Sequence, residues 1–244
     1  MAILSCKTRG GQCKLRPLVK RAAGGKVSVL RRFDAVIFDM DGTLIEPLLD
    51  FRALRDELGV RPDAGILEDI ASMPPAQAEA AHRKLLEREL SAAAKANLMP
   101  GAAETISAVR LAGMKTALLT RNAAPAMQRV LERFGSLRFD LAWSREDGPI
   151  KPEPDGILRA CATLGVRPER TVCVGDFHFD LIAARAAGAV SVLLATGERP
   201  AFADEADHVI RRLRELPALL GIAPPPGENP PRQGSKTPRP DGEK

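Results

Sequence analysis

A single segment, residues 33–44, constrains this chain more than any other. Its apolar run ends in Asp39 and Asp41, and Gly42 follows directly. A buried strand is expected to stop at Asp39, after which the chain turns over, as the conformational freedom of glycine permits. Two acids at the end of a buried strand are unfavourable unless a cation or a transferred charge neutralises them. The segment therefore predicts a functional site at the carboxyl end of a central strand.

Short apolar runs alternate with helical patterns along most of the chain. Each run is followed by Gly, Asp, Thr or Asn, which are typical of strand ends and turns. This alternation predicts an α/β fold in which helices cover both faces of a parallel sheet. Ligands bind beyond the carboxyl ends of the strands in such sheets, so the chemistry is expected there. The predicted strands are 33–38, 115–119, 171–175 and 190–194, with a weaker one near 138–142, and the predicted helices are 101–112, 123–134, 153–164, 178–187 and 211–220.

Residues 46–99 interrupt the alternation, because their pattern predicts helices alone, at 50–58, 64–72 and 75–96. The segment directly follows the two acids, so it is placed to act as a lid that excludes water from charged chemistry. The alternative is an ordinary helical hairpin that packs on the sheet.

Basic residues are concentrated at one end of the chain. Residues 1–33 hold nine Lys and Arg and no acid, whereas residues 34–221 carry a net charge of −5. The body therefore offers no basic surface for nucleic acid. The basic arm fits an organelle transit peptide. That interpretation places the protein in an organelle matrix or stroma, with a plastid favoured over a mitochondrion. The alternatives are a misassigned start codon or a disordered arm, in which case the protein is expected to be cytoplasmic.

The other end, residues 222–244, is rich in proline and glycine and is expected to be a disordered tail. The longest apolar runs are far shorter than the ~20 residues that cross a bilayer, so no membrane span is expected. The oligomeric state stays open.

Polar side chains follow other predicted strands as well. Each has an ordinary explanation when taken singly, such as a helix cap or a turn. Together they place further carboxylates, a hydroxyl and a lysine at the same sheet edge as the two acids, which is improbable by chance. The set comprises Thr120, Arg121 and Asn122 after one strand, Asp176 and Asp180 after another, and Lys151 shortly before a helix.

These residue types fit phosphoryl transfer. Transfer to an enzyme carboxylate divides one difficult displacement into two easier ones. Carboxylate and phosphate repel until a cation bridges them, and Mg²⁺ needs only one or two carboxylates besides the phosphate. A lysine and a hydroxyl stabilise the charge of the transition state, and a second carboxyl protonates the leaving alkoxide.

Four segments, in this order, resemble the four motifs of the haloacid dehalogenase-like hydrolase superfamily. They are Asp39-Met40-Asp41-Gly42-Thr43-Leu44, the strand-end Thr120, Lys151-Pro152-Glu153-Pro154-Asp155 and Gly175-Asp176-Phe177-His178-Phe179-Asp180. Met99-Pro100-Gly101 is similar to the re-entry into the core in phosphoglycolate phosphatase-like members. The resemblance spans roughly 33–221. It implies a Rossmann-like parallel-sheet core, residues 34–45 and 100–221, with a small all-helical cap, residues 46–99, inserted after the first strand.

The resemblance also implies a role for each motif residue. Asp39 would be the nucleophile and a Mg²⁺ ligand. Asp41 would be the general acid and base, with its backbone carbonyl also facing the metal. Thr120 would hold the phosphoryl group, and Lys151 would tie it to Asp39. The remaining implied metal ligands are Asp176 and Asp180, and the remaining implied phosphate-binding residues are Gly42, Thr43, Arg121 and Asn122.

Asp41 indicates the kind of reaction. Dehalogenases and P-type ATPases resemble this motif but lack an acid at this position, so Asp41 indicates a phosphatase or a phosphomutase. We expect a magnesium-dependent phosphatase that hydrolyses a small soluble phosphomonoester through an aspartyl-phosphate intermediate. The alternatives are a phosphosugar mutase of the same family and a catalytically idle regulatory or scaffold protein.

The substrate stays open among phosphoglycolate, a sugar phosphate and a nucleoside monophosphate. Arg52 and Arg55, on the first predicted helix of residues 46–99, would suit an anionic substrate tail. The favoured expectation is that they are solvated or pair with acids such as Asp56 and Glu57. His178, inside the last motif, is expected to be structural or to lie at the rim of the site.

Overall fold

A six-stranded parallel sheet forms the centre of the molecule in the computed structural model, which describes residues 19–21, 27–29 and 33–222. The strand order is β5-β4-β3-β6-β7-β8, so β3, the strand that carries the two acids at its end, lies inside the sheet between β4 and β6. The bounds are β3 Ala35–Phe38, β4 Lys115–Leu119, β5 Leu141–Trp143, β6 Thr171–Gly175, β7 Val190–Leu194 and β8 His208–Ile210.

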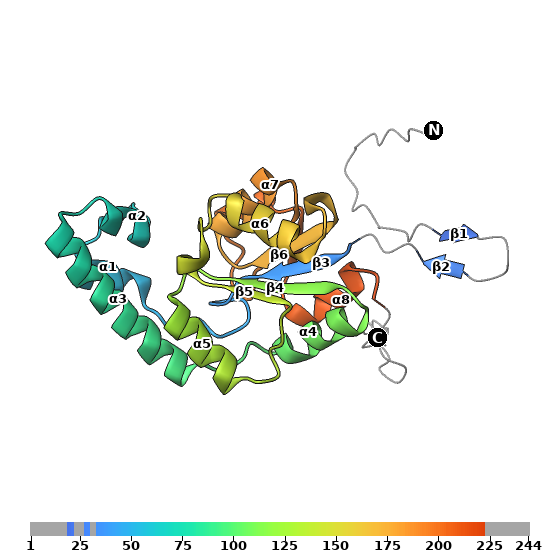
Figure 1. Cartoon of the computed structure of the whole chain (residues 1–244), viewed down its shortest axis with the longest axis horizontal. Coiled ribbons are helices and arrows are strands. Elements are labelled where there is room, and N and C mark those ends of the chain that lie inside the picture. The colour runs from blue at the N-terminus through green and yellow to red at the C-terminus, as the bar shows by residue number, and fades with distance from the viewer. Residues whose placement is uncertain (1–18, 22–26, 30–32, 223–244) are drawn as a thin grey trace, which may run out of the picture.

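Successive side chains of β3 pack against different helices, because side chains alternate between the two faces of a sheet. Val36 and Phe38 belong to one apolar cluster, with α4 (Ala102–Leu111), α5 (Ala124–Arg133) and α8 (Leu216–Leu219). Ile37 belongs to the opposite cluster, with α6 (Asp155–Leu164) and α7 (His178–Ala187). Helices therefore cover both faces of the sheet, as Figure 1 shows, and the predicted α/β fold is confirmed.

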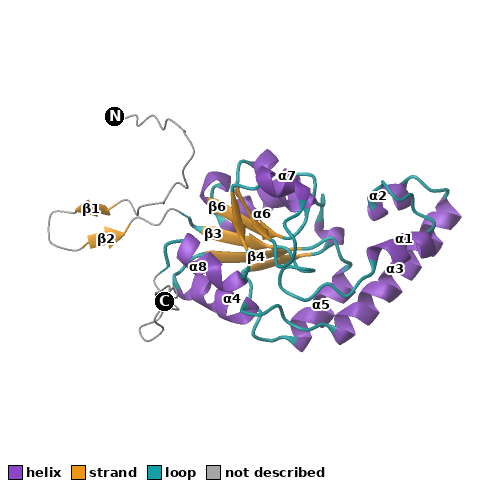
Figure 2. Cartoon of the chain, turned by 180° about the vertical axis from the view of Figure 1, so that it is seen from behind, coloured by secondary structure: helices purple, strands orange, loops and turns teal. Residues whose placement is uncertain are grey.

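The segment between β3 and α4 is helical, as predicted. It contains α1 (Phe51–Leu58), α2 (Ile66–Ala71) and α3 (Pro75–Lys95). Leu54, Leu58, Ile70 and Leu85 join the three helices in a small apolar cluster of their own. One end of α3 lies beside α5, and the helix carries α1 and α2 away from the sheet, as Figures 1 and 2 show.

Two predicted elements differ from the structure, and one strand was not predicted. The weak strand near 138–142 is shifted to β5, because the Asp140 carboxylate accepts a hydrogen bond from the backbone N–H of Thr116 at 2.8 Å. The helix predicted at 211–220 shortens to a 3₁₀ turn, Leu213–Glu215, followed by α8, since Arg212 has an extended backbone. Strand β8 was not predicted, because it has only three residues.

The remaining elements are short. Three further 3₁₀ turns cover Arg145–Asp147, Pro168–Arg170 and Ala201–Glu205, and β1 (Val19–Arg21) pairs antiparallel with β2 (Val27–Val29). The predictions of a targeting arm at 1–33 and of a disordered tail at 222–244 fall almost entirely outside the described residues. Among the described helices, none combines the length and the apolar character that a membrane span requires.

Candidate active site

The carboxyl ends of β3, β4 and β6 place the motif residues at one edge of the sheet. Asp39 directly follows β3, and its backbone N–H donates a 2.9 Å hydrogen bond to the carbonyl of Val174 in β6. Thr120 directly follows β4, and Asp176 directly follows β6. A cavity of about 410 Å³ opens at this edge, between the sheet and the helical segment. The motif residues that line it are Asp39, Asp41, Thr120, Arg121, Asn122, Lys151, Asp176 and Asp180.

Lys151 joins two of the carboxylates. Its Nζ forms an ion pair with Asp39 and lies 2.7 Å from Oδ1 of Asp180. Burial alone lowers the pKa of a lysine, but here the attraction of Asp180 and Asp39 outweighs it, so the pKa of Lys151 is raised. The lysine therefore stays charged and holds the nucleophile predicted at Asp39 in a fixed position.

Asp39, Asp176 and Asp180 each direct a carboxylate oxygen to one point, and these oxygens lie within 4.8 Å of one another. Burial and then the neighbouring carboxylates raise the pKa of Asp39 to about 6 and that of Asp176 to about 8, in both cases against the attraction of Lys151. Mg²⁺ prefers oxygen ligands and needs only one or two carboxylates besides a phosphate. The three carboxylates therefore form a donor set of the kind that a magnesium ion takes.

Gly42 allows the Asp176 carboxylate to lie close to the backbone of the turn after β3. Its backbone has φ +72°, and a Cβ at this position would lie 2.1 Å from Oδ2 of Asp176. Any side chain here would both strain the backbone and displace Asp176. Gly42 therefore admits the Asp176 carboxylate, and the phosphate binding that the resemblance implies for Gly42 stays a prediction.

Asp41 lies at the same cavity and is held by Asn122. Asn122 Nδ2 donates a 2.8 Å hydrogen bond to Oδ2 of Asp41, and the backbone N–H of Asn122 donates to Oγ1 of Thr120 at 3.1 Å. Burial, then the charges of Asp39 and Glu89, raise the pKa of Asp41 to about 7. The carboxyl can therefore carry or release a proton near neutral pH, as a general acid and base must.

Thr43 and Arg121, which the resemblance implies bind phosphate, have different surroundings from each other. Thr43 is fully buried, its Oγ1 has no hydrogen-bond partner among the described residues, and it does not line the cavity. Its side chain therefore packs inside the turn after β3. Arg121 does line the cavity, but its guanidinium is already engaged. It forms an ion pair with Glu68 of α2 at 2.8 Å and contacts the carbonyl oxygen of Lys151.

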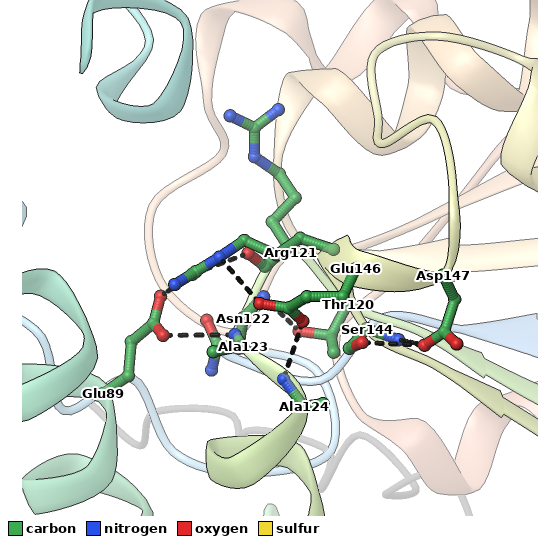
Figure 3. Close-up of polar contacts among 10 residues, drawn as sticks. Glu89, Thr120, Arg121, Asn122, Ala123, Ala124, Ser144, Glu146 and Asp147 are labelled. Atoms are coloured by element: carbon green, nitrogen blue, oxygen red, sulfur yellow. Dashed lines mark hydrogen bonds and ion pairs between the residues drawn. The ribbon is translucent and has the colours of Figure 1, made fainter. Parts of the chain in front are cut away.

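Sequence reasoning missed Glu89, on α3, which is only 3% exposed. Its Oε2 accepts a 3.1 Å hydrogen bond from the backbone N–H of Ala123, and its Oε1 lies 2.5 Å from Nη1 of Arg145. Glu146 accepts a 2.8 Å hydrogen bond from the next backbone N–H, that of Ala124. Figure 3 shows these carboxylates converging on the loop that carries Thr120. The only signal in the sequence would have been a carboxylate on the inner face of an amphipathic helix.

The expectation for Arg52 and Arg55 is that they are solvated or pair with acids such as Asp56 and Glu57. Arg52 is exposed. Arg55 lines the cavity, and it donates hydrogen bonds to the carbonyls of Phe51 and Ala64 at 3.2 and 3.5 Å. Glu57 pairs with Arg88 of α3 instead.

His178 lies outside the group of cavity-lining residues, as expected for a structural or rim position. Its Nε2 lies 3.0 Å from Oε2 of Glu205, and its ring stacks on Phe202 with centroids 5.2 Å apart. These contacts join the start of α7 to the 3₁₀ turn after β7.

Known proteins that are similar to this chain share one family. The family model for haloacid dehalogenase-like hydrolases matches residues 33–188. A haloacid dehalogenase-like hydrolase domain-containing protein of Arabidopsis thaliana is 34% identical over 175 residues, which cover 67% of this chain and 71% of that protein. A phosphoglycolate phosphatase of Pseudomonas putida is 30% identical over 221 residues, 78% of this chain and 80% of that protein.

A crystal structure of CbbY from Rhodobacter sphaeroides in complex with phosphate superposes with a TM-score of 0.60. It is 25% identical, and the match covers 75% of this chain and 96% of that one. The fold, the order of the motifs and the family match agree with one another. The chain therefore belongs to the haloacid dehalogenase-like hydrolase family and is similar to phosphatases within it.

Proposed function

We propose that this chain is a magnesium-dependent phosphatase that hydrolyses a small phosphomonoester through an aspartyl-phosphate on Asp39. One observation carries the proposal: Lys151 holds Asp39 beside a second and a third carboxylate, at a cavity that Asp41 also lines. A fixed nucleophile, a cationic partner and a carboxyl that exchanges protons are the groups that the reaction needs.

In the first step, a carboxylate oxygen of Asp39 attacks phosphorus, and the bond from phosphorus to the ester oxygen breaks. The electron pair leaves with that oxygen, which takes a proton from Asp41. The pKa of Asp41, raised to about 7 by burial, supports a protonated carboxyl at neutral pH. Because Asn122 donates to Oδ2 of Asp41, the proton belongs on Oδ1.

In the second step, water attacks the phosphorus of the aspartyl-phosphate and gives its proton to the Asp41 carboxylate. The bond between Asp39 and phosphorus breaks, and inorganic phosphate leaves. Lys151 and the hydroxyl of Thr120 stabilise the charge on the transferred group in both steps. A magnesium ion held by Asp39, Asp176 and Asp180 would supply the positive charge that brings the two anions together.

The test is release of inorganic phosphate from a panel of phosphate esters, with Mg²⁺ and with EDTA. The wild-type protein is expected to release phosphate only with Mg²⁺, and D39N is expected to release none above background. Analysis of the organic product separates the two enzymatic alternatives, because a mutase forms an isomer without free phosphate. Equal background rates for wild type and D39N would support the idle scaffold and contradict the proposal.

A further inference from the structure

The cavity is larger than a phosphate group requires. Its volume is about 410 Å³, whereas cavities that enclose whole drug-sized ligands begin at ~300 Å³. Much of the wall beyond the carboxylates is apolar. The apolar side chains are Leu49, Phe51, Ile66, Leu67 and Leu85 from the helical segment, and Phe177 and Phe179 from the start of α7.

Two aromatic rings of this wall are exposed. Phe51 is 46% exposed and Phe177 is 50% exposed, and they come from the helical segment and from the core respectively. Phe177 also meets Phe179 edge to face, with ring centroids 5.2 Å apart. Aromatic rings that line a cavity and remain half exposed favour a ligand that covers them, because each buries a large apolar area when another ring packs on it.

A polar group accompanies the apolar wall. Arg55 has no carboxylate partner among the residues that the structure describes, and it donates hydrogen bonds to the backbone carbonyls of Phe51 and Ala64. The other two cations that line the cavity are already neutralised, Lys151 by Asp39 and Asp180, and Arg121 by Glu68. Arg55 is therefore the cavity-lining cation that can meet an oxygen acceptor on the ligand.

We infer that the site takes a phosphomonoester whose leaving group carries an aromatic ring, in preference to a two-carbon acid such as phosphoglycolate. The inference rests on the proposed function, because it assumes that the phosphate lies at Asp39. The ring packs between Phe51 and Phe177, where it displaces water from both faces. A two-carbon acid is too small to cover these rings and would leave them exposed.

Two esters that differ only by the ring test this preference. Ethyl phosphate and 2-phenylethyl phosphate both release a primary alkoxide, so their chemical steps are matched. The wild-type kcat/KM is expected to be about 10 to 100 times higher for 2-phenylethyl phosphate, the factor that burial of an aromatic side chain supplies. Phosphoglycolate is expected to give a lower kcat/KM than 2-phenylethyl phosphate.

F51A is the informative variant, because Phe51 is exposed and its loss does not open the core. The ratio of the two kcat/KM values is expected to fall at least about 5-fold in F51A, since part of the buried area is lost. L111A is the matched control. Leu111 is 86% exposed at the end of α4 and does not line the cavity, so the ratio is expected to stay at the wild-type value.

A measurement of binding without turnover distinguishes a failure of the aromatic preference from a failure of the proposed phosphatase activity. Calorimetry with D39N in the presence of Mg²⁺ is expected to show the same preference for 2-phenylethyl phosphate without turnover. If both esters are hydrolysed and bound equally well, the phosphatase proposal stands and the aromatic preference is wrong. If neither is hydrolysed but the binding preference persists and falls in F51A, the phosphatase proposal fails and the aromatic site stands. If neither is hydrolysed or bound, both are overturned.

Discussion

Arg121, in the loop after β4, forms an ion pair with Glu68 of α2, with its Nη2 2.9 and 2.8 Å from the two carboxylate oxygens. The pair connects the core to the helical segment across the cavity. The same guanidinium lies 4.8 Å from the ring centroid of Phe179. Arg121 is therefore placed to hold the helical segment over the site.

Arg121 is expected to act through Glu68, so R121A and E68Q should have the same effect. Each variant is expected to raise KM about 2-fold to 5-fold, the scale of a partly exposed ion pair. The double variant should raise KM no more than either single variant does, because both remove the same interaction. Steady-state kinetics of the two single variants and the double variant measure this. A much larger loss in R121A than in E68Q would mean that Arg121 binds the phosphate directly.

Gly42 and Gly59 make a matched pair for testing the close approach of Asp176. Both have positive φ, +72° and +68°, but a Cβ at Gly59 would meet nothing within 4 Å. G59A is expected to cost only the backbone strain, about 1 kcal/mol of unfolding free energy. G42A is expected to cost the same strain and also to weaken Mg²⁺ binding at least 10-fold, because it displaces Asp176. Titration calorimetry and urea unfolding check both, and equal Mg²⁺ affinities would contradict the role of Gly42.

Asp41 is expected to serve proton transfer rather than metal binding by its side chain. The carboxylate group that converges on one point consists of Asp39, Asp176 and Asp180, without Asp41. D41N is therefore expected to bind Mg²⁺ as the wild type does and to lose at least ~100-fold in kcat. Calorimetry and phosphate release measure the two quantities, and a loss of Mg²⁺ binding that matches the loss of kcat would contradict this division of roles.

The sequence alone predicts most of the fold, because strand-length apolar runs with polar ends leave little ambiguity. It also predicts that Asp39, Lys151 and Asp176 meet, since the carboxyl ends of neighbouring parallel strands lie at one edge. These statements depend only on local patterns and on how parallel sheets are built. Strand β8 was missed because three residues are too few to form such a pattern.

What the sequence cannot predict are contacts between distant elements. Glu89 lies on a helix with many charged neighbours and would be expected to face solvent, but its contact with Arg145, 56 residues further along, buries it. The pairing of Arg121 with Glu68 spans 53 residues and depends on where the helical segment places α2 relative to the loop after β4. Thr43 belongs to a motif, yet the turn directs its side chain into the core.

The raised pKa values predict how stability depends on pH in the absence of Mg²⁺. Burial and neighbouring charge raise the pKa to about 6 for Asp39, about 7 for Asp41 and about 8 for Asp176. The folded protein therefore binds more protons than the unfolded chain between about pH 4 and 8, so the free energy of unfolding falls as pH rises through this range. Asp140, whose pKa is lowered from the ordinary value of 3.8, against the effect of burial, by the hydrogen bond from the backbone N–H of Thr116 and by Arg110, loses its proton below this range.

The measurement is urea unfolding in EDTA from pH 5.5 to 8.5. Each excess proton in the folded state corresponds to ~1.4 kcal/mol per pH unit. The slope is expected to be negative for the wild type and smaller in magnitude for D176N, which removes one of the titrating carboxyls. Addition of Mg²⁺ should stabilise the wild type most at the alkaline end. A slope that is zero or positive in EDTA would contradict the raised pKa values.

Glu89 and Arg145 form a buried ion pair beside the loop that carries Thr120, with exposures of 3% and 13%. Removal of one partner leaves the other charge buried, so R145A is expected to lower the free energy of unfolding by about 3 kcal/mol. R88A is the control. Arg88 lies on α3, as Glu89 does, but its ion pair with Glu57 of α1 is exposed, so its loss should leave the urea midpoint nearly unchanged. E89L is expected to lower kcat as well as stability, because a leucine cannot accept the backbone N–H of Ala123, the neighbour of the Asn122 that holds Asp41. Unfolding curves and kcat values for E89L, R145A and R88A measure both effects, and a kcat for E89L equal to that of the wild type would limit Glu89 to a role in stability.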